Sequence, residues 1–193
     1  MRVARPALLI QNDSETENNL SQALTSLGER ESSSEHLQQA ITACNEAFKE
    51  LTRRRVPLEW AATQNNLGTA LMDLGERESG TARLEQAVAA FNAALKECTR
   101  ERVPRNWATT QTGLGHALRD IGQRTRDANL ICEALGKHVS AWKVFSDASY
   151  DATDASGGAR KDIGVLEQEF PDTHRKCIDQ HHDDLKQMGV IKN

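Results

Sequence analysis

The amino-acid sequence predicts an all-α protein: an α-solenoid of three antiparallel helix pairs with a C-terminal helical cap. Its main feature is self-similarity at 47 residues, because Trp60 opens the run WAATQNNLGTALMDLGER and Trp107 opens WATTQTGLGHALRDIGQR. A period of about 20–50 residues is typical of solenoids, in which each unit buries its apolar face against its neighbours. The aromatic content of 4% and the near absence of β-branched runs favour thin stacked helices over a sheet.

The second repeat, about residues 57–103, shows how each unit should fold. Pro57 suits the first position of a helix, where its missing N–H breaks no hydrogen bond. Leu67, Leu71 and Leu74 then recur at spacings of three and four, which predicts one buried stripe. Gly75 is expected to end this helix in a left-handed conformation. After a polar loop, a second helix should present Leu84, Ala87, Val88, Phe91, Ala94 and Leu95 to the first.

The neighbouring repeats follow the same plan, over about residues 12–56 and 104–145. The first repeat matches the other two less closely, as expected for a terminal repeat. It has Asp13 where the others have Trp and Ser21 where they have Gly. Gly68 and Gly115 fall inside helices, where each costs about 1 kcal/mol relative to Ala. Their recurrence predicts that another helix passes too close for a Cβ.

The pattern Leu67-Gly68…Leu71…Ala87…Phe91…Ala94 resembles the tetratricopeptide repeat, in the longer-loop variety found in bacterial arrays. The third repeat keeps the pattern with His138 where an aromatic residue is expected. The resemblance covers about residues 12–145. It implies paired helices and a concave groove, lined by the first helix of each pair, in which a peptide or a partner's helix binds.

The C-terminal part departs from the repeat. Residues 146–158 are rich in Ser, Asp, Ala and Gly and are expected to form a loop. Residues 159–193 return to helical spacing, with a break at Pro171 and a last helix over 173–188. We expect a helical cap on the solenoid, with a docking tail for a partner as the alternative.

Aligning the motifs transfers the groove positions of the family to this chain. The partner-binding candidates are Asn18, Gln22, Asn65, Thr69, Met72, Thr112, His116 and Arg119, and Thr25, Asp73 and Asp120 fall on the same face. Asn65, Thr69 and Met72 lie at i, i+4 and i+7, apart from the buried leucines. Asparagine both donates and accepts, so Asn18 and Asn65 could hold an extended peptide backbone. The alternative is that these residues are simply solvated helix surface.

The charges narrow the partner class. A net charge of −4 and a pI near 5.9 give no general attraction to nucleic acid or to an anionic membrane. Two Arg-rich segments, Arg53-Arg54-Arg55 and Arg100-Glu101-Arg102, follow second helices, where cations complement the helix dipole. A binding strip for an acidic partner is the alternative. No apolar run is long enough for a signal peptide or a membrane span, and the four scattered cysteines suggest a reducing compartment, so we expect a cytoplasmic protein.

Neither a metal site nor an enzyme is predicted. His174, Cys177 and His181 share a helical face, but structural zinc sites usually draw ligands from two elements with paired spacing. Cys44, Cys98, Cys132 and Cys177 are expected to be small buried hydrophobic residues. The chain has no Gly-x-Ser-x-Gly elbow and no nucleotide-binding loop.

These expectations combine into one functional hypothesis. The chain should be a non-catalytic interaction module, without cofactor, that binds a protein or peptide in its concave groove. The alternative is structural self-assembly through the end faces or the C-terminal tail, and a homo-oligomer is compatible with either hypothesis.

Overall fold

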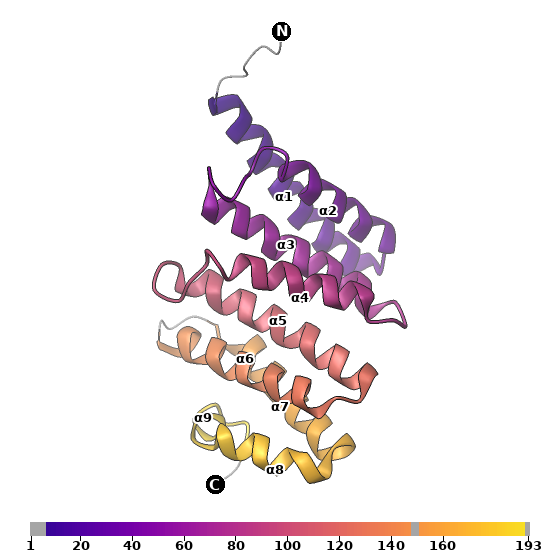
Figure 1. Ribbon diagram of the computed structural model, residues 1–193, viewed down its shortest axis with the longest axis vertical. Coiled ribbons are helices and arrows are strands. Elements are labelled where there is room, and N and C mark those ends of the chain that lie inside the picture. Colours follow the sequence, from indigo (N-terminus) through magenta and orange to yellow (C-terminus); the bar gives the residue numbers. More distant parts are fainter. Residues whose placement is uncertain (1–6, 148–150, 192–193) are drawn as a thin grey trace.

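The computed structural model describes residues 7–147 and 151–191, which form nine helices and no strand. The helices are α1 (Ala7–Glu31), α2 (Ser34–Ala47), α3 (Pro57–Glu76), α4 (Ala82–Ala94), α5 (Pro104–Thr125), α6 (Ala128–Asp147), α7 (Thr153–Glu169), α8 (Pro171–Gln180) and α9 (His182–Gln187). They stack in chain order along the longest axis, so the two ends of the chain lie at opposite ends of the molecule (Figure 1). The predicted all-α solenoid is confirmed.

Helices α1/α2, α3/α4 and α5/α6 form successive antiparallel pairs. The first helices α1, α3 and α5 also contact one another, and α7 continues this row by packing on both α5 and α6. Pro57 and Pro104 occupy the first turns of α3 and α5, and the valines before them have nearly the same backbone conformation. Ser33 starts α2 by accepting a hydrogen bond from the His36 N–H at 3.3 Å.

The glycines inside the first helices mark close helix crossings, as the sequence predicts. A Cβ at Gly68 would lie 2.7 Å from the Phe91 ring, and one at Gly115 would lie 2.7 Å from the His138 ring. The expectation for Gly75 was wrong, because it lies within α3 and Glu76 and Arg77 follow it in right-handed conformation. A Cβ at Gly75 would meet the Leu84 side chain at 3.0 Å, so this glycine permits a close approach of α4.

The core lies between the two helix layers. Phe91, Leu84 and Ala87 of α4 pack against first-helix residues such as Leu71 and Leu114. Alanine is the commonest residue type at these buried positions, which allows short distances between neighbouring helices. The low hydrophobic content of the sequence therefore suits a stack that is only two helices thick.

The segment 146–158 was expected to be a loop, but 146–147 and 153–158 are helical, while 148–150 lie outside the described residues. Helix α6 extends through Asp147, and α7 begins at Thr153, where the backbone N–H donates to Asp151 Oδ1 at 2.9 Å. The small residues Ala155 and Gly158 are buried because α7 packs closely on α6, so their size serves packing. The last predicted helix is divided at His181 into α8 and α9.

Candidate functional site

A polar hollow of about 220 Å³ lies on the face formed by α1, α3 and α5. We call it the amide hollow; its lining residues are Asn18, Gln22, Ala62, Asn65, Asn66, Cys98, Asn106, Thr109 and Thr110. Three of the predicted groove residues, Asn18, Gln22 and Asn65, thus lie together. The remaining lining residues were not predicted to bind a partner. Two of them, Asn66 and Thr110, are also polar and lie within the runs that begin at Trp60 and Trp107.

Hydrogen bonds between the first helices hold the amides of this hollow in place. Asn66 Nδ2 donates to Asn18 Oδ1 at 2.9 Å, which joins α3 to α1. The Thr110 hydroxyl donates to Asn65 Oδ1 at 2.9 Å, which joins α5 to α3. Each amide keeps a further donor or acceptor for a ligand, because an Asn side chain offers both. The hollow therefore presents a preformed set of hydrogen-bonding groups.

The other second-repeat candidates and Thr112 have less free surface. Thr69 donates its hydroxyl hydrogen to the Asn65 carbonyl at 3.2 Å. Met72 is buried within the core, and Thr112 is buried with its hydroxyl donating to the Ala108 carbonyl at 3.1 Å. These side chains shape the floor of the face rather than its exposed surface.

His116 and Arg119 belong to a second polar cluster, where α7 covers α5. His138 Nδ1 lies 2.6 Å from Asp162 Oδ2, and both side chains are fully buried. Arg119 Nη1 lies 3.6 Å from Asp162 Oδ1, and the His116 ring centre is 4.9 Å from that of His138. Asp162 was not predicted, since α7 lies outside the repeats; the only sequence signal was His138 at an aromatic position.

Burial dominates the electrostatics of this cluster. Desolvation, followed by the electrostatic effects of the neighbouring His138, Arg119 and Lys161, lowers the pKa of His116 to about 3. Burial also raises the pKa of Asp162, while the hydrogen bond with His138 and the charge of Arg119 oppose that rise. The arrangement has the character of a buried ion pair that fixes α7 onto the stack.

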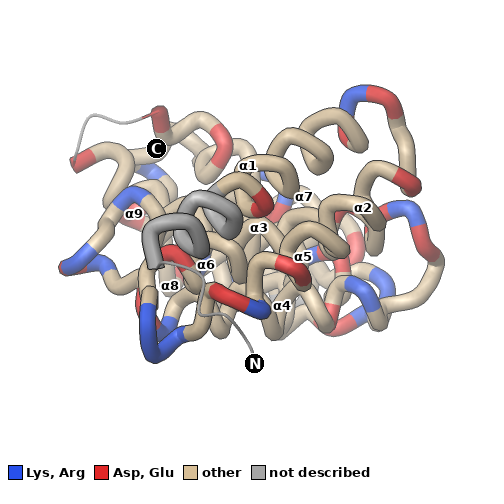
Figure 2. Tube along the Cα trace, turned by 90° about the horizontal axis from the view of Figure 1, so that it is seen from above, with Lys and Arg blue, Asp and Glu red and all other residues tan. Residues whose placement is uncertain are grey.

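The Arg-rich segments make contacts within and between repeats. Arg53 Nε donates to Glu97 Oε1 at 2.6 Å and lies over the Trp60 ring, and Arg100 pairs with Asp147 at 3.7 Å. Arg102 donates to the Glu97 carbonyl at 3.3 Å, as expected for a cation at a helix end. Blue and red segments are interspersed in the loops on both sides of the molecule (Figure 2), and Arg53, Arg100 and Arg102 each have an acidic partner.

The repeated Leu-Gly-Glu-Arg run also has a structural explanation. Arg77 donates to the Gly28 carbonyl at 2.9 Å, and Arg124 donates to the Gly75 carbonyl at 2.9 Å. Each arginine thus satisfies a carbonyl near the end of the preceding first helix. The run joins consecutive repeats and does not line the amide hollow.

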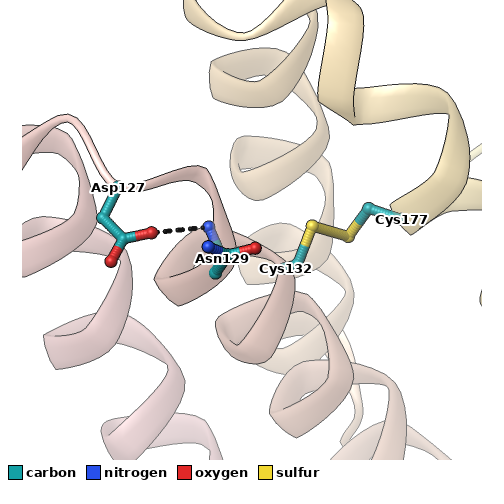
Figure 3. The surroundings of a disulfide bond; sticks show 4 residues. All are labelled: Asp127, Asn129, Cys132 and Cys177. Carbon is teal, nitrogen blue, oxygen red and sulfur yellow. Dashed lines mark hydrogen bonds between the residues drawn. A yellow bond between two sulfur atoms is a disulfide. The ribbon is translucent and has the colours of Figure 1, made fainter.

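Cys177 is buried in the apolar cluster of the cap, as expected, but it is not a free thiol. Cys177 of α8 forms a disulfide with Cys132 of α6, beside the start of α6 where Asp127 accepts from the Asn129 N–H (Figure 3). Because the two residues are 45 positions apart with no framework spacing, the pairing could not be read from the sequence. Cys44 and Cys98 are free and buried, as expected. The cysteines therefore no longer support a reducing compartment.

The tail residues considered for metal binding make other contacts. Cys177 is bonded to Cys132, and His174 Nδ1 contacts the Pro171 carbonyl oxygen at 2.6 Å. Across the described ranges, no group of three His, Cys, Asp or Glu side chains is arranged to hold a metal ion. None of the described helices has both the length and the apolar character needed to cross a bilayer.

The stacked helix pairs and the polar face along their first helices define a helical repeat protein. The family model described as the tetratricopeptide repeat matches residues 18–50 and 60–97, so this part of the chain is similar to tetratricopeptide repeats. Such repeats generally mediate protein–protein interaction and are generally non-catalytic. No curated protein and no solved structure gives a significant match to the chain.

Proposed function

We propose that the chain is a non-catalytic module that binds an extended segment of a partner protein on the face formed by α1, α3 and α5. The observation that carries this proposal is the amide hollow, in which side chains from three successive first helices meet. An extended peptide presents backbone N–H and C=O groups along its length. Asparagine and glutamine amides can both accept from the former and donate to the latter.

The amide hollow suits a backbone rather than a charged group. Its lining contains no charged side chain, and its amides are held by the Asn66–Asn18 and Thr110–Asn65 hydrogen bonds. Preformed groups lose little conformational entropy when a ligand binds. Of the predicted contact residues, Asn18, Gln22 and Asn65 would touch the segment first, while Met72 and Thr112 would support it from below. His116 and Arg119 would act at its margin near α7.

The side-chain amide resonances of the protein test this proposal. A random library of 12-residue peptides would be selected on the full chain, and the NMR signals of the Asn side chains would be followed as a selected peptide is added. We expect shifts for Asn65 and Asn66 but none for Asn92, which is exposed on α4. The variant Gln22→Lys should weaken binding, whereas Asn92→Lys should not. Shifts at Asn92 without shifts at Asn65 would place the site elsewhere and contradict the proposal.

Self-assembly through the N-terminal end is the second candidate function. Leu20 is 45% exposed and is the only large exposed hydrophobic side chain among the described residues. It stands one repeat before Leu67, which packs against the core. Arg30 stands one repeat before Arg77 and donates to no carbonyl within the described part of the chain. A second copy seated on α1 would cover both. Sedimentation would then show a concentration-dependent mass that Leu20→Glu abolishes.

A further inference from the structure

The amide hollow is large enough to admit a side chain of a ligand. Its volume of about 220 Å³ is several times the roughly 30 Å³ that one water molecule occupies. Asn18, Asn65 and Asn66 are half-buried where they line it, and we call these three the floor amides. Ala62 lines the hollow one helical turn before Asn65 and adds only a methyl group to it. A side chain of the bound segment can therefore enter the hollow while the backbone lies at its opening.

The hydrogen bonds between the first helices leave part of each floor amide unused. The oxygens of Asn18 and Asn65 accept from Asn66 Nδ2 and from the Thr110 hydroxyl, both at 2.9 Å. In the part of the chain that the structure describes, no hydrogen bond occupies Asn18 Nδ2, Asn65 Nδ2 or Asn66 Oδ1. The floor therefore offers both N–H donors and an acceptor oxygen to a ligand.

A side-chain carboxamide satisfies such a floor better than any other side chain. Its oxygen can accept from Asn18 or Asn65, and its nitrogen can donate to the oxygen of Asn66. A carboxylate has no hydrogen to donate, and an ammonium or guanidinium group cannot accept. Any ion would also lose water without meeting an opposite charge, because no residue that lines the hollow is charged. A hydroxyl has a single hydrogen, and an apolar side chain would leave the floor amides unpaired.

This floor is not repeated between α3 and α5. Thr112 stands one repeat after Asn65, but it is buried and its hydroxyl donates to a carbonyl of its own helix at 3.1 Å. Gly113 stands one repeat after Asn66, and the Phe91 ring lies where a Cβ would have to be. Backbone groups recur along an extended segment, whereas a floor that occurs once can select only one residue of it.

We propose that the amide hollow selects an asparagine or glutamine side chain of the bound segment. The inference rests on the proposed function, because the backbone of the same segment would lie along the face formed by α1, α3 and α5. The segment should carry one such residue at a fixed position, with backbone hydrogen bonds on either side of it. Gln22 and Asn106 line the hollow and are exposed, so their amides are accessible for those backbone bonds.

Peptide selection on matched variants tests the inference. The library of 12-residue peptides would be selected on the wild type, on Asn66→Ala and on the control Asn19→Ala, which changes the exposed residue one repeat before Asn66. We expect asparagine or glutamine at one fixed position on the wild type and on the control, and no such preference on Asn66→Ala. Ala62→Leu, which fills the hollow and removes no hydrogen-bonding group, should abolish the preference as well. Circular dichroism would verify that each variant is folded.

One selected peptide would then be compared with a version in which glutamate replaces its glutamine, or aspartate its asparagine. This exchange keeps the shape of the side chain and removes its N–H donors. Fluorescence anisotropy at pH 7.5, where the carboxylate is ionised, should show about tenfold weaker binding of the acidic version, or a larger loss. The ratio of the two affinities should fall on Asn66→Ala and persist on Asn19→Ala.

The outcomes separate the inference from the proposed function. Peptides without a preferred asparagine or glutamine that still shift the Asn65 and Asn66 signals would overturn the inference and leave the proposed function standing. Equal binding of the amide and acidic versions would have the same meaning. Peptides that shift neither signal would overturn both.

Discussion

Two helix crossings in this molecule share a geometry and differ in chemistry. Phe91 of α4 lies between Gly68 of α3 and Gly113 of α5, and a Cβ at either glycine would lie 2.7 Å from its ring. His138 of α6 lies in the same way between Gly115 of α5 and Gly158 of α7. A ring on α4 and a ring on α6 therefore each fill a gap that glycines of the two adjacent helices leave open.

The difference lies in what each ring requires. Phe91 needs only apolar neighbours, whereas His138 brings two ring nitrogens into the interior, where an unpaired polar group costs about 1–3 kcal/mol. Asp162 of α7 meets one of them at 2.6 Å. A helix that follows α6 must therefore carry both the glycine and the carboxylate. We interpret the pair as a device that specifies α7 as the neighbour of α5 and α6 and that ends the array.

Removing the carboxylate should give the largest effect. Asp162→Ala leaves His138 and Arg119 without their shared partner, and breaking a buried ion pair costs about 3–5 kcal/mol. Urea unfolding should show this loss, and hydrogen exchange should locate it in α7. Asp154→Ala, on the same helix but with a side chain that is 77% exposed, should cost less than about 0.5 kcal/mol.

A double variant distinguishes coupling from a simple packing loss. His138→Phe with Asp162→Ala reproduces the apolar ring of the Phe91 crossing, and Arg119 keeps Asp120 at 3.3 Å. It should be more stable than Asp162→Ala alone, because no imidazole is left unpaired. Strictly additive effects of the two substitutions would show that His138 and Asp162 do not depend on each other.

The disulfide bond is a second difference between the cap and the repeats, after the His138–Asp162 contact. The bond between Cys132 and Cys177 joins α6 to α8 across 45 residues, and closing a loop of that length contributes about 2–4 kcal/mol. Dithiothreitol should therefore lower the free energy of unfolding by that amount and increase hydrogen exchange in α8. The same reductant should leave the Cys132→Ser/Cys177→Ser variant unchanged. No effect on the wild type would mean that the two thiols do not pair in solution.

The sequence predicted whatever recurs or is local. The helix pairs follow from the repeated leucines, and the close crossings at Gly68 and Gly115 follow from glycines kept inside helices. Asp162 and the Cys132–Cys177 bond were missed because they are single contacts between distant segments with no second copy.

Asn66 and Thr110 were missed for another reason: motif transfer places a residue on a helix face, but only the neighbouring helix determines which amides meet. Gly75 shows that the same residue type serves either a turn or a close approach.

Exchanging one ring for the other tests the comparison from the apolar side. Phe91→His introduces an imidazole between Gly68 and Gly113 without a carboxylate such as Asp162. We expect a loss of about 2 kcal/mol or more, from the unpaired ring nitrogens and the lost apolar contacts. Phe91→Leu, which keeps the position apolar, should cost less in the same urea titration. Equal losses would show that ring shape alone matters at this crossing.

The cap should also respond to acid. Because the pKa of His116 is about 3 in the folded protein, against an ordinary value of 6.5, the unfolded chain binds more protons between those values. Stability should therefore fall as the pH drops below 6.5, with a limit of about 1.4 kcal/mol per pH unit. The wild type should lose this stability relative to His116→Gln, whereas His182→Gln, which changes an exposed histidine, should follow the wild type. Asp73 and Asp162, whose raised pKa values act in the opposite direction, remain in every variant, so they cancel in the comparison.

Hydrogen exchange at pH 5 should show the opening in α7 before α4, because the Phe91 crossing contains no group that titrates. A uniform loss of protection along the stack would show instead that the polar and apolar crossings unfold as one unit.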